Sequence, residues 1–222
     1  MSIIHISENA YDELQQMLAK EGYRIALQRQ NRAVSAPVST HPDIYVCKLG
    51  TSPKSPIFHG DINKLGPKYP EDVLYNAVVT EKFMICNKDT VSPELIQAAQ
   101  SMYPELRLIK VKQGYTKCNV IPVDDIHFIT EDRGIAKALD NVEGTECLLI
   151  DSGHVLLPGF DRGFIGGCCG RLGNDIWFNG DITKHPDFKN IYEMINKCGL
   201  GIKYISEKPL LDIGSIIEEP KQ

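Results

Sequence analysis

The feature that most constrains the fold of this chain is a segment that it contains three times. The clearest pair is Asn76–Asp89 and Asn119–Asp132, which align without a gap at an offset of 43 residues. A third copy, Cys168–Asp181, matches the segment that begins at Cys118 with an offset of 50 residues. Self-similarity at a period of this size is typical of repeat and propeller architectures.

Each copy predicts the same order of elements: a strand, a turn, a second strand and the start of a helix. After the predicted strand Phe83–Cys86, Ser92 is the expected N-cap and Pro93 suits the first helical position. In the third copy, apolar residues at helical spacing predict a helix that follows Asp181 and ends near Gly199.

The two ends of the chain resemble one further unit that is divided between them. Ile3–Ser7 is similar to Ile126–Thr130, and a helix is predicted from Tyr11 to Lys20. The partner strand that this unit lacks is available in Leu210–Ile217. We therefore expect the last strand of the chain to pair with the first.

The spacing of equivalent strand ends indicates five units of about 44 residues each. The extra unit falls between Tyr23 and about Leu65, with strands at Arg24–Gln28 and Ile44–Cys47 but no clear helix. No long linker or low-complexity stretch interrupts the 222 residues. The sequence therefore predicts an α/β fold in one domain over residues 1–222.

This anatomy resembles the pentein fold, the five-bladed α/β propeller of the guanidino-group-modifying enzymes, and the chain looks like a bacterial-type member of that superfamily. The resemblance implies a propeller of five pseudo-symmetric ββαβ-like units that is closed by pairing of the N- and C-terminal strands. The same scaffold is used by the non-catalytic initiation factor that keeps ribosomal subunits apart.

Equivalent positions of the units are expected to collect around a central cavity, because the first strand of each unit lies nearest the axis of such a ring. Penteins bind their substrates there. Polar and thiol side chains recur at these positions, where a plain core would carry Val or Leu. We expect Asn76, Lys117, Cys118 and Asn119 to contact a substrate.

The glycine-rich segment Gly163–Gly170 contains the adjacent cysteines Cys168 and Cys169. Glycines let a ligand approach the backbone and the thiol, and a thiolate there could attack a guanidinium carbon. A glycine-rich strand also precedes the nucleophilic cysteine of pentein enzymes. The alternative is that both cysteines are buried and inert, and that the glycines only permit tight packing.

His154 is the expected general acid/base, since Gly153-His154-Val155 resembles a segment of agmatine-deiminase-like penteins and precedes Cys168 by 14 residues. The alternative is an ordinary turn between two strands. Asp72 lies in a segment that resembles the acidic strand start which holds the substrate's guanidinium in several penteins. A carboxylate matches the paired N–H donors of that cation, and the alternative is a loop acid beside Pro70.

The chain also departs from the enzyme pattern that the resemblance implies. Where catalytic penteins carry a histidine, this chain has Thr116-Lys117-Cys118, and where they carry the nucleophilic cysteine it has Gly214-Ser215. A catalytic member would need a relocated Cys–His pair or chemistry of another kind.

His41-Pro42-Asp43 could form an acid/base pair or bind a metal, but His185-Pro-Asp187 repeats the pattern at a helix start, which favours a local structural role. The sequence has no CxxC or HExxH spacing, so we expect no metal site and no cofactor. The glycine-rich segments also lack the P-loop lysine and the GxGxxG spacing of nucleotide-binding motifs.

Composition sets broader limits on partners. A formal charge of −5 and a pI near 5.7 argue against nonspecific nucleic-acid binding and suit a small cationic ligand such as a guanidinium. No apolar run reaches membrane-span length, and the first residues lack the features of a signal peptide. Seven cysteines at irregular spacing do not form a disulfide framework, so we expect a cytoplasmic protein.

Two functions follow from these observations. The first is a cysteine-dependent hydrolase or transferase that acts on a guanidino or amidine small molecule, with Cys168 or Cys169 as nucleophile. The second is a non-catalytic pentein module that binds a protein partner or a small ligand. Asn, Cys and Lys side chains at axial positions are costly to bury without a ligand or water to satisfy them, which favours the first.

Overall fold

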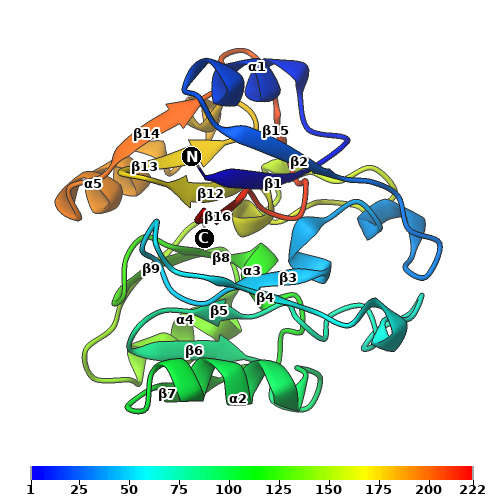
Figure 1. Cartoon of the computed structure of the whole chain (residues 1–222). Coiled ribbons are helices and arrows are strands. Elements are labelled where there is room, and N and C mark those ends of the chain that lie inside the picture. Colours follow the sequence, from blue (N-terminus) through cyan, green and yellow to red (C-terminus); the bar gives the residue numbers. More distant parts are fainter. Residues whose placement is uncertain (1, 222) are drawn as a thin grey trace.

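The computed structural model describes residues 2–221 as a mixed α/β structure of short sheets and helices. Figure 1 shows helices α1, α2 and α5 at the periphery, with most of the strands further inside. Strands β1 and β16, which come from opposite ends of the chain, pair with each other.

Four sheets share one strand order. In each, a short strand pairs antiparallel with a second strand, a helix follows, and a third strand returns parallel to the second. The four sets are β16 (Ile217–Glu219), β1 (Ile3–Ser7), α1 (Asp12–Lys20) and β2 (Arg24–Gln28); β5 (Val78–Val79), β6 (Phe83–Cys86), α2 (Pro93–Met102) and β7 (Arg107–Lys110); β8 (Val120–Pro122), β9 (His127–Thr130), α4 (Arg133–Asp140) and β10 (Glu146–Leu149); and β12 (Cys169–Leu172), β13 (Asp175–Phe178), α5 (Phe188–Lys197) and β14 (Gly201–Tyr204).

The remaining elements are shorter. Two further sheets have two strands each, and several 3₁₀ helices connect the sheets. These elements are β3 (Val46–Lys48) paired with β4 (Ile57–His59), β11 (Val155–Leu156) paired with β15 (Leu210–Leu211), α3 (Thr116–Asn119), η1 (Ala36–Val38), η2 (Pro42–Ile44), η3 (Ile62–Lys64), η4 (Ile165–Cys168) and η5 (Ile182–Lys184).

The predicted pairing of the last strand with the first is confirmed, but its position was wrong. Ile3, Ile4 and His5 lie opposite Glu219, Glu218 and Ile217, so the partner strand begins where the predicted one ends. Leu210–Leu211 pairs with β11 instead. The segment between them turns through Gly214 and Ser215, both at positive φ, and cannot continue as a strand.

Local signals mark the starts of α2 and α4. Ser92 is the N-cap residue of α2 and Pro93 lies in its first turn, as predicted, but the Ser92 hydroxyl donates to Glu94 and accepts no hydrogen bond from a helix N–H group. Asp132 caps α4 by accepting hydrogen bonds from the N–H groups of Gly134 and Ile135, at 2.7 and 2.9 Å. The helix predicted after Asp181 is divided in two, because η5 ends at Lys184, His185 is extended, and α5 begins only at Phe188.

The first strands of the units lie beside one another. β16 contacts β12 and β3, β3 contacts β5, and β12 contacts β8, while Val78 of β5 and Val120 of β8 share one hydrophobic cluster. Gly170 of β12 shows how close this approach is, because a Cβ there would lie 1.7 Å from a backbone carbonyl oxygen. These short strands therefore pack closely against one another.

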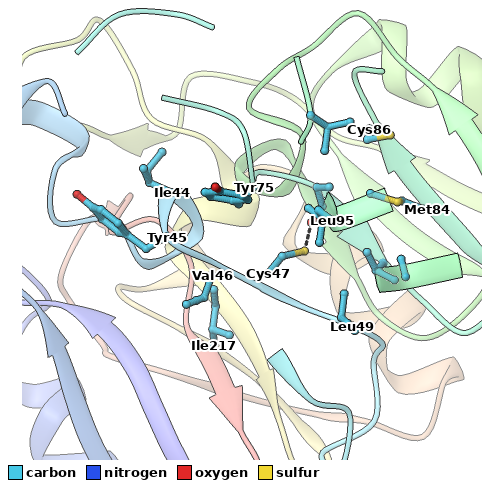
Figure 2. Close-up of a cluster of buried hydrophobic side chains, with 14 of the residues drawn as sticks. Ile44, Tyr45, Val46, Cys47, Leu49, Tyr75, Met84, Cys86, Leu95 and Ile217 are labelled. Carbon is cyan, nitrogen blue, oxygen red and sulfur yellow. Dashed lines mark hydrogen bonds between the residues drawn. The ribbon is translucent and has the colours of Figure 1, made fainter. Parts of the chain in front are cut away.

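Four hydrophobic clusters fill the space between sheets and helices. Figure 2 shows part of the cluster around β3, in which Val46 lies beside Ile217 and the Cys47 side chain points toward Leu95 of α2. The Cys47 thiol donates to the carbonyl oxygen of Ala77 at 3.3 Å. This cluster joins the two-stranded sheet of β3 and β4, which lacks a helix of its own, to the next unit.

Candidate functional site

Ionisable side chains from three separate segments meet in the interior near α3. His41 and Asp43 come from the start of η2, Cys118 from α3, and Asp212 and Ser215 from the turn before β16. Each of the five is at most 3% exposed. We call these five residues the central cluster.

Asp43 lies at the middle of the central cluster. Its Oδ2 accepts hydrogen bonds from the Cys118 thiol at 3.0 Å and from the Ser215 hydroxyl at 2.8 Å, and its Oδ1 has no partner among residues 2–221. Burial raises the pKa of the Asp43 carboxyl, although nearby His41 acts in the opposite direction. One carboxylate oxygen of Asp43 is therefore buried without a donor within residues 2–221.

Asp212 is a second buried carboxylate of the cluster. Its oxygens accept from the backbone N–H groups of Gly214 at 3.0 Å and Phe164 at 2.9 Å. Burial raises the pKa of Asp212 to about 6, although the two backbone donors act to lower it. Nδ1 of His41 lies 3.8 Å from Oδ1 of Asp212, and burial lowers the pKa of His41, so the imidazole is neutral at pH 7.

Cys118 is held within reach of both His41 and Asp43. One ligating atom from each of these three residues lies within 4.8 Å of the others. Burial, followed by the charge of Asp43, raises the pKa of Cys118 well above its ordinary value. The thiol is therefore protonated in this arrangement, and a nearby base must accept its proton before the sulfur can act as a nucleophile.

Asn76 and Lys117 fix the position of α3 beside the cluster. Oδ1 of Asn76 accepts from the backbone N–H groups of Lys117 and Cys118 at 2.7 and 3.4 Å. Nζ of Lys117 donates to the Ser215 hydroxyl at 3.0 Å and to the Gly166 carbonyl oxygen at 3.2 Å. Asn76 therefore holds α3 through its backbone, and Lys117 ties α3 to Ser215 and Gly166.

The backbone is strained at the edge of the cluster. Gly214 has φ +68° and Ser215 has φ +73°, a conformation that few residues other than glycine adopt. A Cβ on Gly214 would lie 2.1 Å from Cβ of His41. The strain places the Ser215 hydroxyl against Asp43 and lets η2 approach, which is a pattern typical of functional sites.

Two cavities reach the cluster from outside. One of about 130 Å³ is lined by Tyr115, Cys118, Phe160, Arg162 and Asp212, together with His41. A second of about 560 Å³ also contacts His41 and Asp212, and Leu157 borders both cavities. A third, of about 50 Å³, lies between the inner strands and is lined by Lys48, Lys117, Cys169 and Arg171 among others.

Cys168 and Cys169 lie apart from His154. Both cysteines are fully buried, the Cys168 thiol donates to the Ile165 carbonyl oxygen at 3.1 Å, and burial raises the pKa of both. His154 instead lies 3.3 Å from Asp151 and packs edge-on against His185, with 4.9 Å between ring centroids. The structure does not join these three residues in one site.

Asp72 and Asn119 lie beside the cluster rather than in it. Oδ2 of Asp72 accepts from the Tyr115 hydroxyl at 2.6 Å, and its Oδ1 is buried without a partner among the described residues. The Asn119 side chain donates to the Tyr115 carbonyl oxygen at 2.9 Å. Asp72 borders a surface groove of about 1220 Å³ that shares Tyr115 and Phe160 with the smaller cavity.

Sequence reasoning missed three members of the central cluster. His41 and Asp43 were assigned a local role because His185 and Asp187 repeat their spacing, and Asp212 carried no signal. The same spacing has a different outcome at the second position, because Nδ1 of His185 accepts from the Asp187 N–H at 3.1 Å, a contact within the same turn.

Side chains of the types that bind metals also come together without a recognisable sequence motif. In residues 2–221, His41, Asp43 and Cys118 form one group whose ligating atoms lie within 4.8 Å, and Asp124, His127 and Cys198 form another. The expectation of no metal site rested on short ligand spacings, and these groups join distant segments.

The chain is thus a mixed α/β protein in which a buried cluster of a thiol, an imidazole and two carboxylates lies beside two cavities. The chain belongs to a family of unknown function, DUF6873, whose model matches residues 54–217. No curated protein matches the sequence. Among solved structures, the chain resembles an X-ray structure of a candidate agmatine deiminase, with 9% identity and a TM-score of 0.47, over 98% of this chain and 82% of that one.

Within residues 2–221, no helix is both long and apolar enough to cross a membrane.

Proposed function

We propose that this protein is a pentein-type hydrolase or transferase in which the central cluster acts on the amidinium or guanidinium group of a small cation. The proposal takes the whole chain as one domain of five units, with β3 and β4 as the unit that lacks a helix. The shared strand order of four sheets and the contacts between their first strands support this ring. The observation that carries the function is the burial of His41, Asp43, Cys118 and Asp212 at one point.

Burying four ionisable groups together is costly, and the cost indicates selection for something other than stability. A polar group buried without a full set of hydrogen bonds costs about 1–3 kcal/mol by mutational data. Oδ1 of Asp43 has no partner in the described chain. A planar cation could satisfy it, because a carboxylate is the natural partner of paired N–H donors.

Cys118 is the nucleophile in this proposal, in place of Cys168 or Cys169. Cys118 lines the cavity of about 130 Å³ with His41 and Asp212, whereas Cys168 contacts none of the described cavities. His41 is neutral and within 4.8 Å of the thiol, so it can accept the thiol proton. Asp212 orients the imidazole and stabilises the imidazolium that forms.

The reaction balances with these groups alone and water. The Cys118 thiolate attacks the amidinium carbon, ammonia or an amine leaves with the proton from His41, and an S-linked amidine intermediate remains on the sulfur. Water then adds to the same carbon while His41 accepts its proton. Collapse of that adduct breaks the carbon–sulfur bond, and the thiol regains its proton.

The substrate is a compact head group on a longer molecule. The inner cavity of about 130 Å³ is smaller than a typical ligand pocket of roughly 300 Å³ or more. The adjoining groove bordered by Asp72 and Tyr115 would accept the remainder. In this proposal Asn76, Lys117 and Asn119 support the site by positioning α3, and Asp72 contacts the substrate outside the cluster.

The test is ammonia release from a panel of guanidino and amidine compounds by the purified protein. Cys118→Ala should abolish turnover of any active compound, and Cys168→Ala, a matched buried cysteine outside the cavity, should leave turnover within about twofold if the variant is folded. Turnover that survives in Cys118→Ala would overturn the assignment of the nucleophile.

A second function is favoured by the protonated thiol and the small inner cavity. In this alternative, the protein is a non-catalytic pentein module that binds a cation or a protein partner. Calorimetry with the same panel separates the two functions, because a guanidinium that binds without any turnover supports the module. Loss of that binding in Asp43→Asn would still place the ligand at the central cluster.

A further inference from the structure

A second group of metal-ligand side chains lies outside the central cluster, where two neighbouring units meet. Asp124 is in the turn between β8 and β9, His127 is the first residue of β9, and Cys198 is the C-cap residue of α5. One carboxylate oxygen, one ring nitrogen and the sulfur lie within 4.8 Å of one another, and all three residues are half-buried. No sequence motif links these positions.

The Asp124 carboxylate is held in place by the backbone. Its Oδ1 accepts from the N–H groups of Ile126 at 2.9 Å and His127 at 2.8 Å. Nδ1 of His127 lies 2.9 Å from both carboxylate oxygens, so the ring nitrogen and the carboxylate face one point. Cys198 faces the same carboxylate, which contributes after burial to raising the pKa of its thiol to about 12.

The other nitrogen of His127 has a partner of the kind that metal-bound histidines use. Nε2 lies 3.5 Å from Oε2 of Glu146, and Glu146 is fixed by Nζ of Lys197 at 2.6 Å. A histidine that ligates a metal through one nitrogen commonly donates the other N–H to a carboxylate, which orients the ring. His127 is therefore placed to ligate through Nδ1 while Nε2–H points to Glu146.

The electrostatic field at the C-terminal end of α5 favours a cation near Cys198. Cys198 follows the last residue of a ten-residue helix, and its N–H bonds to the carbonyl oxygens of Met194 and Ile195. Carbonyl groups at a helix C-terminus carry partial negative charge and favour a cation nearby. The thiol is presented from this end of the helix.

We propose that Asp124, His127 and Cys198 bind one zinc ion that joins the end of α5 to the β8–β9 turn. Sulfur, imidazole nitrogen and carboxylate oxygen are zinc ligands, whereas magnesium and calcium take oxygen ligands. Three protein ligands leave a fourth position for water or a further ligand. On binding, the thiol proton leaves to solvent, the zinc–sulfur bond forms, and the proton of His127 resides on Nε2.

This zinc site is independent of the proposed reaction at the central cluster. It uses a different cysteine and different elements, and its natural effect is to fix two adjacent units against each other. A zinc-dependent change should therefore affect the stability of this region rather than the chemistry at Cys118.

The test is titration of the metal-free protein with Zn²⁺ against a chromophoric chelator, and with Co²⁺ followed by absorption spectroscopy. We expect one equivalent to bind, with a thiolate-to-Co²⁺ charge-transfer band in the near ultraviolet. Cys198→Ser should remove that band, and Cys198→Ser and His127→Gln should each weaken zinc binding by at least about 100-fold, more than the 10- to 100-fold typical of outer partners. Cys147→Ser, a half-buried thiol elsewhere on the same sheet, should change neither measurement.

The His41, Asp43 and Cys118 group provides the competing outcome. If the cobalt band is lost in Cys118→Ser and retained in Cys198→Ser, the metal binds at the central cluster and the proposal is overturned. Absence of stoichiometric binding, or equal affinity in Cys198→Ser and the wild-type protein, would overturn it as well. Neither result bears on ammonia release, so the two proposals fail separately.

Discussion

Replacement of Glu131 by glutamine should stabilise the protein in a way that depends on pH. Glu131 follows β9, is 8% exposed, and neither of its carboxylate oxygens has a hydrogen-bond partner among residues 2–221. Burial raises its pKa from the ordinary 4.5 to about 7, with the nearby Arg162 only partly opposing the effect. Glutamine keeps the shape of the side chain and removes its charge.

The magnitude follows from the proton that the folded protein retains. Each pH unit between the two pKa values corresponds to about 1.4 kcal/mol, so the interval from 4.5 to about 7 gives about 3 kcal/mol. Below pH 4.5 the carboxyl is protonated in both the folded and the unfolded state, and the penalty is absent. As the pH rises through this interval, the unfolded state releases the proton first, and above pH 7 the folded wild-type protein carries the full penalty.

The assay is urea unfolding of wild type and Glu131→Gln at several values between pH 5 and pH 8.5, followed by the fluorescence of Trp177. This is the single tryptophan of the chain and is 1% exposed, so unfolding should shift its emission to longer wavelength. The stabilisation by Glu131→Gln should grow by about 2–3 kcal/mol across the range. Glu143→Gln, an exposed matched control, should show no such growth. An equal effect of Glu131→Gln at both ends of the range would refute the reasoning.

Three further changes test the contacts around the site, each measured by the same unfolding assay. Asn76→Ala removes the acceptor of two backbone N–H groups at the start of α3 and should cost about 2–4 kcal/mol, since these groups are buried. Tyr115→Phe removes the hydroxyl that donates to Asp72 and should cost about 1–3 kcal/mol. Gly170→Ala should cost at least about 3 kcal/mol, because the new Cβ would clash with the neighbouring strand. Gly144→Ala is the control: no atom lies within 4 Å of the new Cβ, and its φ of +87° alone should cost about 1 kcal/mol.

Each of these changes has an outcome that contradicts its argument. For the glycine pair, equal losses would show that the approach of the inner strands relaxes easily. A neutral Tyr115→Phe would mean that water replaces the hydroxyl at Asp72. For Asn76, replacement by Asp should retain part of the stability, because a carboxylate also accepts both N–H groups. Equal stability of Asn76→Ala and Asn76→Asp would show that the side chain does not stabilise α3 as an acceptor.

Much of the local structure could be predicted from short stretches of sequence. The strands Phe83–Cys86 and Ile3–Ser7 and the proline at the start of α2 follow from apolar pattern and backbone preference, which operate over a few residues. The pairing of the two ends followed from similarity to internal segments. The position of this pairing could not be predicted, because the left-handed residues Gly214 and Ser215 interrupt the predicted strand and the pairing strand begins only at Ile217.

The site was harder to predict because adjacent cysteines in a glycine-rich segment give a stronger sequence signal than distant residues that meet in space. Cys168 and Cys169 lie in a buried turn, where their thiols donate to the carbonyl oxygens of Ile165 and Gly166 of η4. Cys118 was expected near a substrate, but its partners His41 and Asp212 lie 77 and 94 residues away in the chain. No local sequence pattern predicts that residues so far apart in the chain lie in contact.

The sequence by itself therefore determined the main strands and helices of the repeated segments, because apolar spacing and backbone preference act locally, and similarity between segments indicated the pairing of the chain ends. It did not predict α3, since Cys118 and Asn119 were expected on a strand. Only the tertiary structure decided that His41 and Asp43 face Cys118 while His185 and Asp187, with the same spacing, bond to each other within one turn. The physical reason is which groups the fold brings together. Packing of η2, α3 and the strained turn before β16 sets His41 and Asp43 against Cys118, Asp212 and Ser215, whereas His185, buried to the same degree at 4% exposed, bonds within its own turn and packs against His154.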